Sequence, residues 1–226
     1  MGDLLQAELY KMYHCKTLTI CVVFVLAIEL VNGFLHGGDQ IGTMILLMEI
    51  IGLVACALFA GAFVCTDFSH KTVYHTLTSG KSRACVWFSR YLAYSAACLL
   101  LLLINALAVN GSVIFFHNDQ LSLAALIWPS ILGYTIGGMI YDLCLVSVFF
   151  LIAMQIKESG LTIAISVILT GLIIANSDLF WVDRLLPLLT PQINALSIPT
   201  TNCLLLLLLP CLVALLGIGL FKRCRL

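Results

Sequence analysis

Long apolar stretches alternate with short polar segments along the whole chain. Each stretch holds 16 to 26 residues, and a helix needs about 20 apolar residues to cross roughly 30 Å of hydrocarbon. The chain is 62% hydrophobic and only 10% charged, whereas soluble proteins average about 45–50% and 25%. We therefore expect an all-α, polytopic membrane protein. Its six predicted transmembrane helices are Thr17–Leu35, Thr43–Cys65, Tyr91–Phe116, Ile131–Met154, Leu161–Asn176 and Cys203–Phe221.

The cations are almost all confined to one side of this predicted membrane. Of the eleven Lys and Arg residues, only Arg184 falls on the other side. The other ten are Lys11, Lys16, Lys71, Lys81, Arg83, Arg90, Lys157, Lys222, Arg223 and Arg225. Because positively charged loops are retained in the cytoplasm, we expect a multi-pass protein of the plasma membrane with both termini cytoplasmic.

Residues 1–16 form an amphipathic segment ahead of the first span. On a helical wheel, one face is apolar and the opposite face is polar. The apolar residues are Leu5, Leu9 and Met12, and the polar ones are Asp3, Lys11 and His14. Such a helix is expected to lie in the cytoplasmic membrane interface, although a solvated N-terminal helix has the same pattern. The remainder, 17–226, is predicted to be one transmembrane domain.

The inner connection 66–90, between the second and third predicted spans, is the longest polar stretch. Val73 and Leu77 are four residues apart, and Gly80 is suited to end a helix. Oxygens that could cap the start of that helix belong to Thr66, Asp67 and Ser69. We expect a short helix and a basic patch, which form either a membrane-surface loop or a docking surface for a soluble partner. The candidate docking residues are Ser69, Lys71, Val73, Leu77, Lys81 and Arg83.

The outer segment 177–202 is too apolar for a loop in water, yet three prolines interrupt it too often for a regular span. We expect one or two re-entrant helices that dip into the outer leaflet, with the freed backbone groups satisfied by neighbouring protein. The polar edge of this segment is a candidate outer gate. Its residues are Trp181, Asp183 and Arg184.

Three carboxylates fall inside predicted spans, where each costs about 2.5–3.5 kcal/mol on insertion scales. Glu29 and Glu49 lie in neighbouring spans at matched depth, and Asp142 lies near the middle of the fourth span. Together with Asn105, they are candidates for a translocation path that carries a cation or proton, or that binds basic groups of a substrate. Alternatively, they form hydrogen bonds with polar neighbours and fix the packing of the helices.

No catalytic or metal-binding pattern is evident in the sequence. Residues 79–82 read Ser-Gly-Lys-Ser, but His75 stands where a phosphate-binding loop needs its first glycine. The ten cysteines are scattered without a Cys-x-x-Cys pair, which indicates packing residues rather than a zinc or redox site. We therefore expect no enzymatic activity, no metal and no cofactor in this chain, and no nucleic acid as a partner.

The layout resembles the permease subunits of ATP-binding-cassette (ABC) exporters of the type-2 family, in which an interfacial helix precedes six spans. The stretch from Gly61 to Arg83 is similar to the segment that carries a Gly-Thr-hydrophobic-x-x-Leu run and then Ser-Arg in such permeases. His70-Lys71-Thr72-Val73 and Leu77 occupy those places, with Lys71 where a glycine is common. The likeness is greatest to small bacterial permeases that export bacteriocins, lantibiotics or bacitracin-like peptides.

The resemblance implies a permease that pairs with itself or with a similar chain and binds two ATPase subunits, which hold ATP and Mg²⁺. The inner loop and the N-terminal helix would transmit nucleotide-driven closure to the spans. A peptide or another amphipathic substrate would then pass between the two permeases, in antimicrobial peptide immunity or resistance. Other classes also fit the sequence: a substrate-binding membrane subunit of a vitamin importer, an integral protein without an energy source, or, less well, an intramembrane enzyme.

Overall fold

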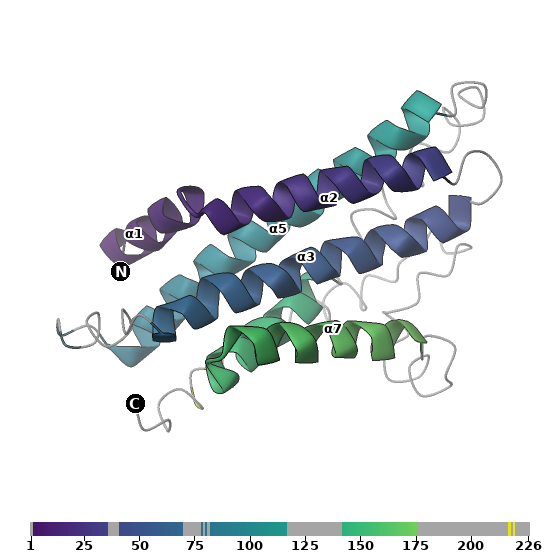
Figure 1. The fold of residues 1–226 in the computed structure, drawn as a ribbon. Coiled ribbons are helices and arrows are strands. Elements are labelled where there is room, and N and C mark those ends of the chain that lie inside the picture. Colours follow the sequence, from purple (N-terminus) through teal and green to yellow (C-terminus); the bar gives the residue numbers. More distant parts are fainter. Residues whose placement is uncertain are drawn as a thin grey trace, which may run out of the picture.

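The computed structural model describes residues 2–35, 41–69, 82–116 and 142–175, together with Thr78, Gly80, Gly217 and Gly219. These residues form helices and no strand, which confirms the predicted all-α class. The helices are α1 (Gly2–Tyr13), α2 (Lys16–Leu35), α3 (Ile41–Ser69), α5 (Arg83–Phe116), the helix Asp142–Ile156 and α7 (Ser159–Ala175) (Figure 1).

Two segments are long and apolar enough by themselves to cross a membrane, Ile50–Phe68 in α3 and Arg83–Ala108 in α5. A third crossing results if Leu4–Tyr13 and Lys16–Asn32, which are bent by 50° relative to each other, form one span. The described residues therefore contain two to three candidate crossings. Shorter apolar helices are Asp142–Ile156 and Ser159–Leu172.

The outer faces of the helices carry large apolar side chains, as expected for contact with lipid. Among those that are more than one-third exposed are Ile20, Val23, Leu30 and Phe34 on α2, Leu99, Leu103 and Leu107 on α5, and Leu161, Ile168 and Leu172 on α7. Soluble monomers rarely expose apolar surface of this extent. The side-chain distribution thus agrees with the hydropathy of the helices and supports a membrane protein.

The predicted spans agree with the helices at several of the described helix ends. α2 begins one residue before the predicted first span, and α5 ends at the predicted Phe116. α7 covers the predicted fifth span to within two residues at each end. Residues 131–141 of the fourth span and the re-entrant segment 177–202 lie outside the described residues. So does most of the sixth span, in which Gly217 and Gly219 are helical.

The inner connection is shorter than the predicted 66–90, because helices continue into both of its ends. α3 runs on to Ser69, and α5 already begins at Arg83. Thr66, predicted as a helix cap, lies inside α3, where its hydroxyl donates a hydrogen bond to the Ala62 carbonyl at 2.5 Å. Asp67, also predicted as a cap, lies inside α3 as well, and its carboxylate is paired with cations from two other helices.

α3 lies between α2 and α5 on one side and α7 on the other (Figure 1). Aromatic rings fill the part of this bundle nearer Ser69 and Arg83. The Phe59 ring stacks on those of Phe63 and Tyr94, with centroids 5.1 and 6.0 Å apart. Such ring pairs contribute about 0.5–1.5 kcal/mol beyond their buried area, so the Phe59–Tyr94 pair helps to hold α3 against α5.

A close approach between α3 and α7 depends on Gly61. A Cβ atom at this position would lie 2.5 Å from Cγ1 of Ile163 and 2.9 Å from the carbonyl oxygen of Ser159. Both distances are below van der Waals contact, so a side chain at position 61 would push the two helices apart. The observed packing of α3 against α7 therefore requires glycine at position 61.

A tight turn joins the helix Asp142–Ile156 to α7. Lys157 has a φ of 61°, in the left-handed region, and its amide donates a hydrogen bond to the Ala153 carbonyl at 3.1 Å. This arrangement is typical of a helix C-terminus, although glycine is the residue that adopts it most readily. The Lys157 ammonium lies 5.5 Å from the centroid of the Phe68 ring, which ties the turn to the end of α3.

Candidate functional site

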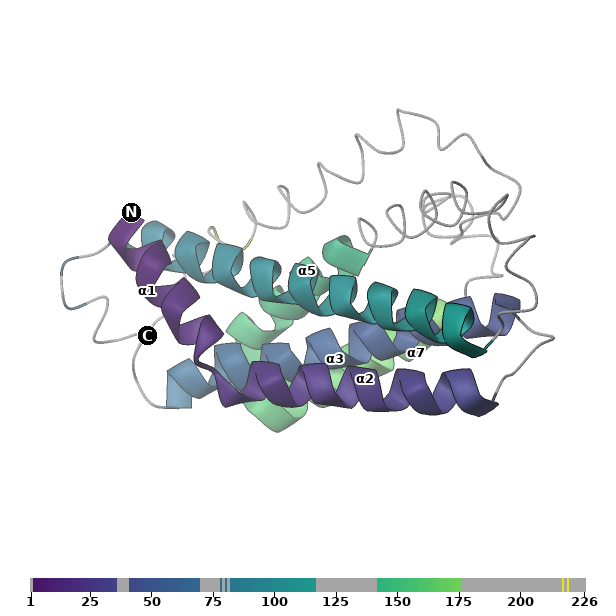
Figure 2. The same cartoon turned by 90° about the horizontal axis from the view of Figure 1, so that it is seen from above.

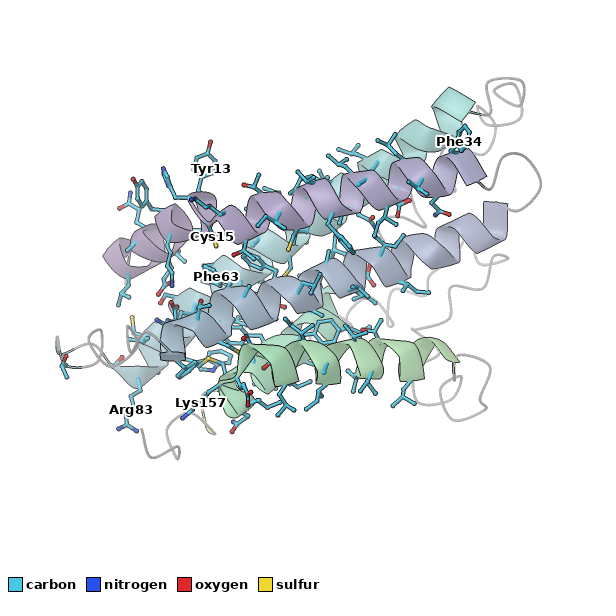
Figure 3. All side chains as sticks on the ribbon, in the orientation of Figure 1. Tyr13, Cys15, Phe34, Phe63, Arg83 and Lys157 are labelled. Carbon is cyan, nitrogen blue, oxygen red and sulfur yellow. The ribbon has the colours of Figure 1, made fainter. Side chains whose placement is uncertain are left out.

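Every Lys and Arg residue in the described part of the chain lies at one end of the bundle, which we call the cationic end. These residues are Lys11, Lys16, Arg83, Arg90 and Lys157. Figure 2 shows α1 crossing from the start of α2 to the start of α5, with which it is in contact. Figure 3 shows Arg83 and Lys157 at this end, opposite to Phe34. The fold thus gathers cations that are far apart in the sequence.

Four charged residues from three helices meet at the cationic end, and we call them the charge network: Glu8, Lys11, Asp67 and Arg90. Arg90 of α5 donates from Nε to Oε1 of Glu8 in α1 at 3.2 Å. Its Nη2 lies 3.1 Å from Oδ2 of Asp67 in α3. The ammonium of Lys11 pairs with the other oxygen, Oδ1, of Asp67. Asp67 of α3 therefore pairs with one cation from α1 and one from α5.

The charge network is largely withdrawn from solvent. Glu8, Asp67 and Arg90 are only 7%, 4% and 3% exposed, whereas the Lys11 side chain remains 42% exposed and its ammonium lies 5.1 Å from the centroid of the Phe63 ring. Two cations and two carboxylates balance, so the network carries no net formal charge. Removal of one partner from a buried pair leaves an uncompensated charge, at a cost of about 3–5 kcal/mol.

Sequence reasoning missed the charge network. Lys11 was expected on the polar, outward face of α1, and Arg90 in the inner connection, but both reach Asp67. A signal was present, because Glu8 and Lys11 are three residues apart and therefore share a face of a helix. The outward face of α1 instead carries Tyr10 and Tyr13, which are 67% and 79% exposed. Such rings are common at the membrane interface, which fits an interfacial position for α1.

A second group of polar side chains is buried among the apolar residues of the bundle. It comprises Glu29 and Asn32 of α2, Asn105 of α5 and Asp142, all at most 7% exposed. The Asn105 amide lies against Gly52 of α3, where a Cβ would be 2.9 Å from Nδ2. Asp142 interacts electrostatically with Cys56, one turn further along α3. Asn105 and Asp142, both predicted translocation-path residues, therefore face adjacent turns of the same helix.

Glu29 is the most deeply buried carboxylate of the described chain, at 2% exposed. Its carboxylate lies next to the side chain of Asn32 in the same helix. In the described part of the chain, its Oε1 has no hydrogen-bond partner. The backbone of Glu49 lies in α3, one turn before Gly52, but its side chain is outside the described residues. The predicted proximity of Glu29 and Glu49 stays a prediction.

Three cysteines that look scattered in the sequence come together in the fold. Cys21 of α2, Cys56 of α3 and Cys98 of α5 are all buried. The thiol of Cys56 lies next to that of Cys98, and Cys21 is close to Cys98. Among the described residues, no group of three or more His, Cys, Asp or Glu side chains is arranged to hold a metal ion. We interpret the cysteines as packing residues of the bundle core.

The predicted docking residues lie at or beyond the ends of two helices. Ser69 is the last residue of α3, and Arg83 is the first of α5 and is exposed. Thr78 is helical and Gly80 has a φ of 82°, as expected for a glycine that ends a helix. The other docking residues, Lys71, Val73, Leu77 and Lys81, lie outside the described residues. The gate residues Trp181, Asp183 and Arg184 do so as well.

Comparison with known proteins leaves the chain without an assigned family. A scan against protein-family models finds no match, and no curated protein matches the chain. The likeness to ABC permeases therefore depends on the layout of the helices and on the stretch from Gly61 to Arg83.

Proposed function

We propose that this chain is the permease subunit of an ABC exporter in the plasma membrane of a bacterium. In this proposal it spans the membrane six times with both termini in the cytoplasm, and it works with a second permease, identical or similar. Two separate ATPase subunits bind ATP and Mg²⁺ and perform all catalysis. The exported molecule is a peptide or another amphipathic compound, as in antimicrobial peptide immunity or resistance.

The observation that carries the proposal is the position of the charge network. Asp67 lies two residues before the end of α3, and Arg90 lies seven residues after the start of α5. Both pair with α1, so one cluster joins the N-terminal helix to the two helices that flank the inner connection. A force on this connection would move the ends of α3, α5 and α1 together, because helices transmit displacement as rigid elements.

The buried polar group supplies candidates for the path of the substrate. Intramembrane carboxylates and amides are costly, and they usually face a bundle interior or a wet cavity. Glu29, Asn105 and Asp142 are buried in the bundle from three helices. In the proposed dimer they would present hydrogen-bond acceptors to basic or polar groups of a substrate, whereas the exposed apolar faces of α2, α5 and α7 contact lipid or the second permease.

Purification from the native host tests the proposal. The tagged chain, extracted in mild detergent, is expected to carry a soluble ATPase in stoichiometric amount, whose sequence contains a complete phosphate-binding loop. The complex should hydrolyse ATP, and replacement of the lysine of that partner's loop should abolish hydrolysis. A chain that purifies without any ATPase and binds a small vitamin tightly would overturn the proposal and indicate a substrate-binding importer subunit instead.

A variant pair locates the docking site. Replacement of Val73 and Leu77 by Asp places charges on the expected apolar contact, so we expect loss of co-purification and of substrate-stimulated ATP hydrolysis. The matched control is Thr78→Asp, on an exposed residue next to the same turn, which should retain both. Unchanged ATPase binding in the Val73→Asp/Leu77→Asp variant, with normal membrane insertion, would exclude this segment as the docking site.

A further inference from the structure

The charge network holds α1 through contacts that can break and form again. We infer that it is a latch, which holds α1 against the ends of α3 and α5 in one state and releases α1 in another. This inference concerns the chain alone and does not rest on the proposed function. It follows from the bend between α1 and α2, from the ion pairs that hold α1, and from two buried atoms that have no hydrogen-bond partner among the described residues.

The bend gives α1 a place about which to move. The axes of the first two helices differ by 50°, and the chain between them, at His14 and Cys15, is not part of either helix. Around it, hydrogen bonds of the tighter three-residue type replace the α-helical pattern: Cys15 donates to Met12 and Leu18 donates to Cys15, each at 3.1 Å. Short connections of this kind absorb the dihedral changes of hinge motions.

The charge network is the ionic part of the contact that holds α1, beside the packing of Met12 against the bundle core. A buried ion pair gains Coulomb energy but loses the hydration of both ions, so its net contribution is often near zero. When α1 swings away, the separated charges regain their hydration at the membrane surface. Breaking the charge network therefore costs little free energy by itself, which favours population of both the closed and the open state.

Two atoms of the network are buried without a hydrogen-bond partner in the described part of the chain, Oε2 of Glu8 and Nη1 of Arg90. Buried polar atoms are rarely left unpaired, since each costs the full desolvation of that group. On release, both atoms would be solvated, which favours opening.

The distance between α1 and the start of α5 tests the latch. Nitroxide labels on unnatural amino acids at the exposed Gln6 and Arg83 avoid the native cysteines, and the full chain is placed in lipid nanodiscs. Gln6 lies about 12 Å along the helix from the bend, so a swing of about 30° would move it on the order of 6 Å. Double electron–electron resonance resolves such a shift.

Removal of one charge and removal of all charges should have opposite effects. Asp67→Asn leaves two cations with only one carboxylate, Glu8, so the network gains a net positive charge and the longer distance should become the main population. A fourfold apolar variant, with Glu8→Leu, Lys11→Met, Asp67→Leu and Arg90→Met, should show only the short distance. Lys16→Gln removes a cation at the same end that is outside the network, and it should match the wild-type distribution.

The outcome that overturns the latch is equally specific. Two results would show that the network merely stabilises one rigid arrangement. Either Asp67→Asn gives the wild-type distances, or the fourfold variant opens as far as Asp67→Asn does. If Asp67→Asn does not fold, Lys11→Met decides the question, because its side chain is 42% exposed and its removal leaves the pairs of Arg90 intact. That variant should increase the longer-distance population, and no increase would refute the inference.

Discussion

The contact between α3 and α7 at Gly61 allows a quantitative test of the fold. In Gly61→Ala, the new methyl group would lie 2.9 Å from the Ser159 carbonyl oxygen and 2.5 Å from Cγ1 of Ile163. The isoleucine can change rotamer, but the carbonyl belongs to the backbone of α7. The helices must therefore separate by about half an ångström to restore contact distances. Overpacking of this kind costs about 1–3 kcal/mol.

Thermal stability is measured in detergent. The readout is the fraction of the chain that stays monodisperse in size-exclusion chromatography. With the scaling of soluble proteins of this length, the cost corresponds to a Tm about 3–10 °C below that of wild type. Gly171→Ala is the matched control, because α7 is exposed there and nothing lies within 4 Å of a Cβ atom. It should be neutral or slightly stabilising, by about 0.5–1 kcal/mol from helix propensity.

A series at both positions separates packing from other effects. Substitution of Gly61 by Ala, Ser and Val should lower the Tm progressively, since each side chain is larger than the last and the carbonyl cannot yield. The same series at Gly171 should show no such gradient with volume. Equal effects at the two positions would refute the close approach of α3 and α7, and with it the reasoning that places Gly61 in their contact.

Three further predictions concern other contacts. Gly52→Ala would displace the Asn105 amide, a flexible group, so we expect a stability loss below about 1 kcal/mol but impaired transport in an export assay; normal transport would argue against a path at this point. Lys157→Gly should be about 1 kcal/mol more stable than Lys157→Ala, because only glycine avoids the cost of the left-handed conformation; chemical denaturation measures the difference. Membrane-permeant iodine should join Cys56 to Cys98 by a disulfide, detected by non-reducing peptide mapping, and a Cys56→Ser variant should not form it.

Much of the helical framework could be predicted from the sequence. The α2 and α7 boundaries follow from the apolar runs, because a helix that contacts lipid must be apolar over its whole length. The ends of α3 and α5 at the cationic end were predicted less well. There, polar residues such as Thr66 and Asp67 suggest a loop, but their hydrogen bonds and ion pairs are satisfied within the bundle, so the helices continue.

The candidate sites, too, could be predicted from the sequence only in part. Asn105 and Asp142 could be singled out because a polar residue in an apolar run stands out, and both are buried in the fold. The charge network could not be assembled from the sequence, since its members are up to 82 positions apart and each has an ordinary place in a polar segment. The cluster of Cys21, Cys56 and Cys98 was missed for the same reason.

The sequence by itself therefore determined the environment of the chain and the positions of its helices. Hydropathy is a local property, so a run of apolar residues indicates a membrane helix wherever it lies in the chain. What only the tertiary structure decided is which charges meet. Whether Arg90 is a solvated cation or one partner of a buried ion pair depends on Glu8 and Asp67, and electrostatic energy depends on distance in space and on burial. Neither quantity can be read from the order of residues along the chain.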